Sequence, residues 1–324
     1  MRILFATDLH GSTLVLRKAI RCCQEFEVDC FLLGGDLSGK WLLPIVRVGD
    51  RLRIFEPEEK IVTMVPDDAR STSQQAYVFQ PRLAADIGIQ ENLQRLEAKG
   101  YYWHFFDSDD DVYSLQPNYY DDLQRAEIRK RLEKWEELVR VELGEERTCF
   151  WTGGNDDEAS LLDDFRKKNT PHFCYAEGMC IPMSDGLNLL SLGWSNRTPF
   201  DTAREMEESD LLAELQRIYR EADDTNNLVL NVHVPPVDCG NLDLCKNEIT
   251  GRMEHVGSTA VRRFIQDTNP IAVFSGHVHE GRGIAKVGRS VVFNPGSAFN
   301  AGVLMAFVVS LNRSGVLDHV HVIR

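Results

Sequence analysis

Short apolar, β-branched runs recur along the chain, and stretches with helical periodicity separate several of them. After Ser12, apolar residues follow the i, i+3, i+4, i+7 spacing of one helix face, and Ser12 itself is typical of a helix N-cap. This alternation predicts an α/β fold in which helices flank two packed sheets. The apolar runs occupy residues 2–6, 31–33, 148–151, 187–192, 228–232, 271–274, 290–293 and 303–310.

Two segments add to this pattern. The charged stretch over 121–143 carries an apolar stripe, which predicts a long helix with a solvated face. In the last third, short strands joined by Gly, Asn and Ser turns predict an antiparallel meander. These strands are expected over 283–286, 290–294, 303–311 and 316–323.

Residues 41–118 do not continue the alternation of strands and helices. They contain a hairpin-like run over 46–54, a polar loop over 66–75, helical material, and an acidic run over 107–111 that we expect to form a solvated turn. We therefore expect one domain over 1–324 with an inserted cap subregion over 41–118. Insertions over a rigid sheet commonly determine specificity.

Composition and charge narrow the class of protein. Hydrophobic residues make up 43% of the chain and charged residues 27%, and no apolar run is long enough to cross a membrane. Because a buried strand starts the sequence where a secretory leader would stand, we expect a cytoplasmic protein without a membrane partner. The eight cysteines have no C-x-x-C spacing, which favours free thiols, with a Cys239 and Cys245 pair as the alternative. A net charge of −14 disfavours an extended nucleic acid as partner. The oligomeric state stays open.

Polar residues that can bind a metal follow most of the strong apolar runs. In an open α/β sheet, ligands bind beyond the carboxyl ends of the strands, so we expect these segments to converge. Residues two apart in an extended chain point the same way, which predicts that Asp8 lies beside His10 and His277 beside His279. Carboxylate, imidazole and amide ligands together suit Mn, Fe, Zn, Ni or Co. The segments are Asp8-Leu-His10, Gly34-Gly-Asp36, Gly153-Gly-Asn155-Asp156-Asp157, Asn231-Val-His233 and Gly276-His-Val-His279.

In this order, the five segments resemble the signature of the calcineurin-like metallophosphoesterase family: D-x-H, G-D, G-N-H-D or a variant, a separate H, and G-H-x-H. The resemblance spans residues 8–279 apart from the insertion, and the turn Asn294-Pro-Gly-Ser297 is also similar. It implies a metallophosphoesterase-type sandwich of two mixed β-sheets and two divalent metal ions, with manganese favoured. One ion would be bound by Asp8, His10, Asp36 and His279, and the other by Asp36, Asn155, His233 and His277, with Asp36 as the bridge.

The resemblance also implies the reaction: hydrolysis of a small phosphate ester by a hydroxide that bridges the two ions. Two divalent ions, two aspartates and a hydroxide leave a positive charge, which attracts an anionic substrate although the whole chain is acidic. Asp156 stands where the family often has a histidine that assists the leaving oxygen. An aspartate, with a reference pKa of ~3.9, is a poor general acid at neutral pH unless its surroundings raise that pKa. Variants without this histidine resemble a branch linked to phosphodiesters, so we expect a diester substrate.

Two further stretches are similar to those of phosphoesterases predicted in archaea and bacteria. In the first, Asn196 and Arg197 are candidate contacts to a substrate phosphate, or else belong to a loop before a helix at Glu205. In the second, His255 is a candidate acid, or else only precedes the helix that Ser258 caps. The candidate catalytic residues are Asp36, Asp156 and His255.

Several other interpretations compete with these. Ser12 has no evident base beside it, and we expect it to cap a helix rather than to act as a nucleophile. The His319-Val-His321 pair lacks the glycine and turn of the metal segments, which disfavours a functional role for these two histidines. The segment from Gly35 to Lys40 lacks the G-D-x-x-D-R-G form of the protein Ser/Thr phosphatases, which disfavours a protein phosphatase. A phosphomonoesterase, a nucleotide pyrophosphohydrolase or a nuclease of the same fold stays open, as does a non-catalytic protein-binding scaffold.

Overall fold

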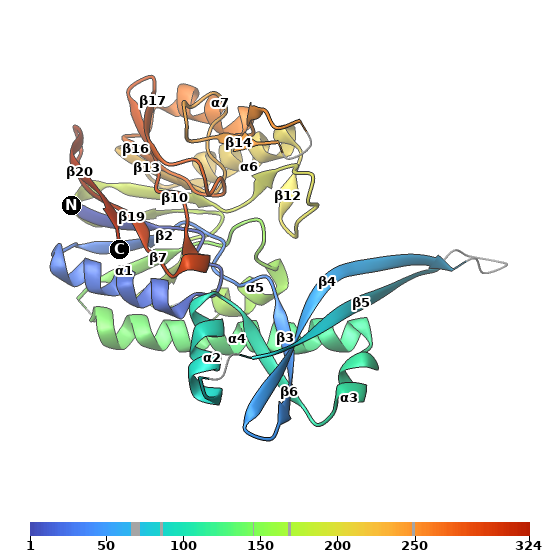
Figure 1. Ribbon diagram of the computed structural model, residues 1–324. Helices are drawn as coiled ribbons and strands as arrows, with labels where there is room; N and C mark the ends of the chain where they lie inside the picture. Colours follow the sequence, from blue (N-terminus) through green and yellow to red (C-terminus); the bar gives the residue numbers. More distant parts are fainter. Residues whose placement is uncertain (66–71, 85–86, 145, 168–169, 248–249) are drawn as a thin grey trace.

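The computed structural model has the predicted architecture, a sandwich of two mixed β-sheets with helices on both outer faces (Figure 1). Each predicted apolar run overlaps a strand. The structure describes residues 1–324 except 66–71, 85–86, 145, 168–169 and 248–249.

The first sheet has six strands, of which four are parallel neighbours and two form an antiparallel edge. Strands that are covered on both faces require nearly continuous apolar sequence, and all four residues of the strand at 30–33 are buried. In spatial order the strands are β20 (Gly315–Ile323), β19 (Met305–Asn312), β1 (Arg2–Ala6), β2 (Cys30–Leu33), β7 (Thr148–Trp151) and β8 (Phe173–Tyr175).

The second sheet has five strands, of which four are parallel. The fifth pairs antiparallel at the edge. In spatial order they are β10 (Asn188–Leu192), β13 (Leu228–Val232), β16 (Ala272–Phe274), β18 (Ser290–Asn294) and β17 (Gly283–Val287).

The prediction of one antiparallel meander in the last third is wrong. The β17–β18 hairpin belongs to the second sheet, whereas the β19–β20 hairpin belongs to the first. The reason lies in the core, because Phe293 on β18 and Phe307 on β19 pack against each other from opposite sheets, with ring centroids 5.3 Å apart. Placing the two hairpins in facing layers buries both rings.

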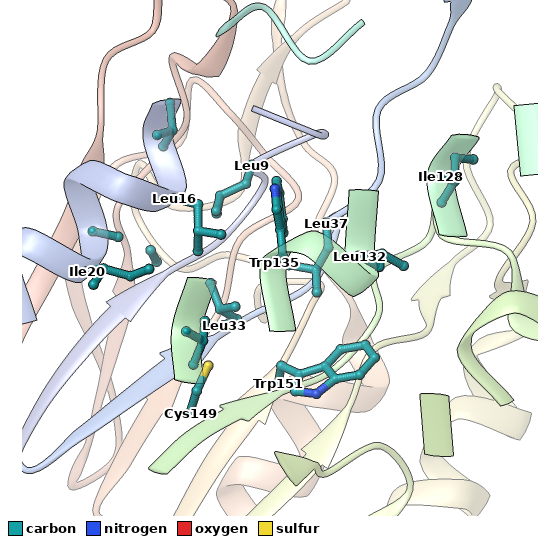
Figure 2. Close-up of a cluster of buried hydrophobic side chains, with 14 of the residues drawn as sticks. Leu9, Leu16, Ile20, Leu33, Leu37, Ile128, Leu132, Trp135, Cys149 and Trp151 are labelled. Atoms are coloured by element: carbon teal, nitrogen blue, oxygen red, sulfur yellow. The ribbon is translucent and has the colours of Figure 1, made fainter. Parts of the chain in front are cut away.

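Five helices cover the outer faces of the sandwich. Helices α1 (Thr13–Glu25), α4 (Pro117–Leu138) and α5 (Ala159–Lys167) pack on the first sheet, and α6 (Glu208–Glu221) and α7 (Thr259–Thr268) pack on the second. Figure 2 shows part of the apolar core between the first sheet and its helices, where Trp135 of α4 lies near Leu16 of α1.

Two of the predicted helix N-caps are confirmed, and one predicted helix start is wrong. As expected, Ser12 caps α1 by accepting a hydrogen bond from the Val15 amide at 3.4 Å, and its side chain is buried. Ser258 caps α7 in the same way. The helix expected at Glu205 begins instead at Glu208, because Glu205 lies in the short strand β12 (Glu205–Met206), which pairs with β11 (Ser195–Asn196).

A third sheet lies in the segment expected to form the cap. Its strands, in spatial order, are β5 (Thr72–Leu83), β4 (Arg51–Val65), β3 (Leu42–Val48) and β6 (Tyr102–Phe106). The hairpin over 46–54 is confirmed as β3–β4. Of the expected polar loop, residues 66–71 lie outside the described residues, and 72–75 belong to β5. Figure 1 shows β4 and β5 extending away from the sandwich.

The acidic run over 107–111 is not the solvated turn that we expected. Ser108 and Asp111 form a capping box that starts the short helix α3 (Asp109–Tyr113). Acidic residues in a first helical turn interact favourably with the helix dipole, which explains the difference. The remaining elements of the described chain include α2 (Ile89–Ala98), a π-helical turn over Val139–Leu143, β9 (Met179–Pro182), β14 (Leu244–Lys246) and β15 (Met253–His255).

Two predictions from composition can be compared with the structure. All eight cysteines are free, as expected, and this includes Cys239 and Cys245. None of the described helices has the length and apolar character needed to cross a membrane.

Candidate metal centre

Five loops meet at one edge of the sandwich, where the carboxyl ends of strands from both sheets lie together. The amide of Asp8 donates to the Gly35 carbonyl at 2.9 Å, and the amide of His10 donates to the Asp36 carbonyl at 2.9 Å. Across the seam between the sheets, the His277 amide donates to both carboxylate oxygens of Asp8 at 3.1 Å. The first sheet presents Asp8, His10, Asp36 and Asn155, and the second presents His233, His277 and His279.

One group of donor atoms contains Asp8, His10, Asp36 and His279. The His279 Nε2 atom lies 3.4 Å from Asp8 Oδ1 and 3.1 Å from His10 Nε2. The His10 Nε2 atom lies 3.7 Å from Asp36 Oδ2. The donor atoms of Asp8, His10 and His279 all lie within 4.8 Å of one another, which is close enough for one ion.

A second group contains Asp36, Asn155, His233 and His277. His233 Nε2 lies 3.4 Å from Asp36 Oδ2 and 2.9 Å from Asn155 Oδ1. His277 Nδ1 lies 2.7 Å from the same Asn155 oxygen. Asp36 Oδ2 is thus the atom that both groups share, which is the placement that a bridging ligand needs.

The backbone at these candidate ligands differs from our expectation of extended chain. Asp8, His10, Asp36 and His277 have φ angles of 54°, 41°, 48° and 65°, in the left-handed region. Non-glycine residues rarely occupy this region, and such strain clusters at functional sites. The side chains converge because the chain turns sharply after β1 and β16, and not because residues two apart share one face of a strand.

Two glycines allow loop backbone to lie directly against the carboxylates. A Cβ atom on Gly154 would lie 2.1 Å from Asp36 Oδ1, and one on Gly276 would lie 2.2 Å from Asp8 Oδ2. Real side chains do not approach so closely. The glycines in the G-N-D-D and G-H-V-H segments are therefore required by the packing of backbone against Asp36 and Asp8.

Hydrogen bonds to groups outside the cluster orient two of the candidate ligands, His233 and Asn155. His233 places Nδ1 3.0 Å from the Gly34 carbonyl, which can only accept, so Nδ1 carries a proton and Nε2 faces Asp36 and Asn155. The Asn155 amide nitrogen donates to the Thr202 hydroxyl at 2.9 Å, which turns its amide oxygen toward the imidazoles. Partners of this kind fix the orientation of metal ligands.

Burial and mutual charge shift the pKa values of the cluster. Burial raises the pKa of Asp36 to about 6, although His233 opposes the shift. Burial alone would lower the pKa of His233, but the charge and hydrogen bond of Asp36, together with Asp8 and the Gly34 carbonyl, outweigh burial and raise that pKa to about 10. Burial lowers the pKa of both His10 and His277 to about 3, with a neighbouring histidine adding to the effect in each case.

The donor set fits divalent metal ions. Carboxylate, imidazole and amide oxygen ligands together suit borderline ions. The Nε2 atoms of His10 and His279 face each other at 3.1 Å, and two lone pairs at this distance need a proton or a cation between them. Buried titratable groups that lie this close together are typical of functional sites.

The two aspartates that follow Asn155 have different surroundings. Asp157 is buried and accepts hydrogen bonds from the amides of Leu37, Ser38 and Gly154 at 3.0, 2.8 and 2.8 Å, so it joins the second and third loops. Asp156 places Oδ2 3.8 Å from His10 Nδ1 and 2.7 Å from Lys40 Nζ. The candidate acid position therefore contains an ion pair.

The structure places the remaining candidates outside the ligand cluster. Arg197 is half exposed and pairs with Glu207 at 3.1 Å, and Asn196 donates to the Val256 carbonyl at 3.4 Å. His255 places Nδ1 3.0 Å from Asp243 Oδ1. Within the described part of the chain, no hydrogen bond or ion pair connects these three candidates to the seven ligand side chains.

Three residues at the site escaped the sequence analysis. Lys40 follows the second ligand segment, but no motif marked its contact with Asp156. Thr202 lies far along the chain from Asn155, and only folding brings them together. The Phe299 ring packs on His10 with centroids 4.5 Å apart, just after the noted Asn294–Ser297 turn, which was the one available signal.

The sequence also matches a known protein family. The sequence profile of the calcineurin-like phosphoesterases matches residues 110–281, more than half of the chain. An uncharacterized protein of Methanocaldococcus jannaschii is 29% identical over 170 residues, which cover 51% of this chain and 71% of the relative.

Two crystal structures have a similar fold. One aligns with a TM-score of 0.56 and 16% identity over 95% of this chain and 94% of the other. The structure of TT1561 of Thermus thermophilus aligns with a TM-score of 0.52 and 11% identity over 99% and 98% of the two chains. At such identities the likeness supports the fold alone. The profile that covers more than half of the sequence goes further, and by it the chain belongs to the calcineurin-like phosphoesterase family of metal-dependent hydrolases.

Proposed function

We propose that this protein is a binuclear metal-dependent phosphodiesterase. The observation that carries the proposal is the position of Asp36 Oδ2, which lies 3.7 Å from His10 Nε2 in one donor group and 3.4 Å from His233 Nε2 in the other. A carboxylate between two sets of ligands suits a pair of ions that it bridges. Two such ions supply an activated water and neutralise charge on the phosphate.

The protein's own residues prepare this site in three ways. Asp8, His10, Asp36 and His279 would hold one ion, and Asp36, Asn155, His233 and His277 the other. Thr202 and the Gly34 carbonyl orient Asn155 and His233. The Phe299 ring packs against the rings of His10 and His279, with centroids 4.5 and 6.0 Å away, and supports their positions.

The preference for a diester rests on position 156. An aspartate there, ion-paired with Lys40, offers no imidazole to protonate a leaving oxygen. Leaving groups of low basicity need less of that help. His255, Asn196 and Arg197 stay candidate substrate groups, and all three would have to reach the substrate from outside the ligand cluster.

The third sheet forms the cap in this proposal. The Ser12 hydroxyl donates to the Ala98 carbonyl at 2.5 Å, and the buried Arg131 guanidinium donates to the carbonyls of Gly11 and Tyr101 at 2.6 and 3.1 Å. These contacts hold residues 98–101 against the loop that carries His10. The cap is thus fastened beside the ligands, where it can select the substrate.

The test combines two measurements on one sample. We expect elemental analysis to find about two divalent ions per chain, with manganese favoured, and we expect bis(p-nitrophenyl) phosphate to be cleaved faster than p-nitrophenyl phosphate. Faster cleavage of the monoester would make the protein a phosphomonoesterase. Absence of both metal and turnover would indicate a binding scaffold.

A further inference from the structure

Lys40 lies at the edge of the candidate metal centre, between the loop that carries Asp36 and strand β3. Its ammonium nitrogen is 2.7 Å from Asp156 Oδ2. Asp156 in turn donates its backbone amide to Asp36 Oδ1 at 3.0 Å. The Lys40 side chain is also 49% exposed, so it contacts the site through Asp156 and remains accessible to solvent.

The fold holds the backbone of Lys40 from both sides. The Gln124 side chain donates to the Lys40 carbonyl at 2.8 Å, and the Gly39 amide donates to the Tyr102 hydroxyl at 2.9 Å. One residue earlier, the Ser38 amide donates to Asp157 at 2.8 Å. These contacts come from α4, β6 and the G-N-D-D loop, and together they keep Lys40 beside Asp156.

The positive charge of Lys40 reduces the repulsion between Asp156 and an anionic substrate. A carboxylate at position 156 would by itself repel a phosphate ester, and the ammonium group of Lys40 neutralises it. Burial alone would lower the pKa of Lys40, but Asp156, with smaller contributions from Asp36 and Asp8, outweighs burial and raises that pKa above its ordinary value. An ammonium group has three donors, and the contact with Asp156 uses one of them.

We propose that Lys40 stabilises the negative charge that develops on the leaving oxygen, in place of the histidine that the G-N-D-D segment lacks. This inference rests on the proposed phosphodiesterase function. During hydrolysis, a bond forms from a water oxygen to phosphorus, and the bond from phosphorus to the leaving oxygen breaks with its electron pair. Lys40 keeps its proton and donates a hydrogen bond to that oxygen, which then takes a proton from water; the attacking water releases one to solvent.

The dependence of the rate on the leaving group tests this role. Wild type, Lys40→Met and Lys40→Arg are compared on bis(p-nitrophenyl) phosphate and on diphenyl phosphate, whose phenolate is the more basic leaving group. We expect Lys40→Met to lower kcat for diphenyl phosphate by about 100-fold, the effect of losing one such donor. The loss on bis(p-nitrophenyl) phosphate is expected to be several times smaller, and Lys40→Arg is expected to recover much of both rates.

A matched control is Lys130→Met, which removes an ion pair of similar length, 2.6 Å to Glu127, on the exposed face of α4. We expect no change in either rate for this variant and unchanged metal content for all of them. Equal losses on the two substrates, or no loss, would overturn the role of Lys40 while leaving the phosphodiesterase proposal intact. A metal-loaded wild type that cleaves neither diester would overturn the proposed function and this inference with it.

Discussion

The hydroxyl oxygen of Thr202 lies 2.9 Å from the side-chain nitrogen of Asn155. Thr202 donates its own hydroxyl proton to Glu205 at 2.6 Å, so its lone pairs face Asn155. The amide oxygen of Asn155 therefore points to His233 and His277, at 2.9 and 2.7 Å. The orientation of one proposed metal ligand thus depends on a chain of two residues that belong to no ligand motif.

Replacing Thr202 by valine tests this relationship. Without the hydroxyl, Asn155 loses the acceptor that fixes its amide, and we expect metal affinity or kcat/KM to fall by about 10- to 100-fold, as for other outer partners of metal ligands. Metal titration and diester hydrolysis measure the two effects. Thr198→Val is the control, because the Thr198 hydroxyl also donates to Glu205, at 2.5 Å, without touching Asn155. Equal effects of the two substitutions would contradict the relay.

Asp36→Asn removes the anion that the two donor groups share. We expect diester hydrolysis to fall by more than about 100-fold, since even outer-shell changes cost about 10- to 100-fold. Elemental analysis is expected to show fewer ions per chain, while circular dichroism shows a retained fold. Turnover at the wild-type rate with unchanged metal content would show that Asp36 is not the bridge.

Gly154→Ala places a methyl group where the backbone meets Asp36. The new Cβ would lie 2.1 Å from Asp36 Oδ1 and 2.3 Å from its amide nitrogen, so the loop must move. We expect a loss of about 1–3 kcal/mol in the free energy of unfolding, which is typical of overpacking, together with weaker metal binding. Urea denaturation and metal titration measure the two effects.

Gly178→Ala provides the comparison for this substitution. Gly178 has a φ of +67° but open space around its Cβ position, so only the backbone cost of about 1 kcal/mol applies. Metal binding is expected to be unchanged in this variant. Wild-type metal affinity in Gly154→Ala would mean that the close approach to Asp36 does not matter.

Glu205 gives a pH dependence whose direction follows from its hydrogen bonds. Burial alone would raise the pKa of Glu205, but hydrogen bonds from Thr198 and Thr202 outweigh burial and hold the pKa below its ordinary value of 4.5. As the pH falls, the unfolded chain therefore takes up this proton before the folded protein does. The stability that Glu205 contributes is complete above the unfolded pKa and is lost as the pH falls through the lower, folded pKa.

The measurement is urea unfolding of wild type and Glu205→Gln across the acid range. We expect the wild type to be the more stable protein at pH 7 and the difference to shrink toward zero in acid. Glu207→Gln is the control. It removes a surface ion pair with Arg197 at 3.1 Å, which contributes little to stability, so we expect only a small difference from wild type at every pH. A difference that stays constant with pH would contradict the assignment to Glu205.

The sequence predicted what depends on short segments. Each proposed ligand follows an apolar strand within a few residues, so the positions of these strands along the chain and the chemistry of the donors could be inferred together. The left-handed backbone at Asp8 and His277 could not, because it results from hydrogen bonds to other loops, such as that from the Asp8 amide to Gly35. The same holds for Lys40 and Thr202, whose partners are fixed only by tertiary packing.

The division of ligands between the two sheets links metal binding to the core. All the proposed oxygen ligands come from the first sheet, whereas three of the four histidines come from the second, and rings such as Phe293 and Phe307 set the spacing of the layers. Ions that bind only the assembled pair stabilise it by mass action. By reciprocity, a substitution that shifts the layers, such as Phe293→Leu, weakens metal affinity without touching a ligand. The metal content of the protein then reports how well its two layers are aligned.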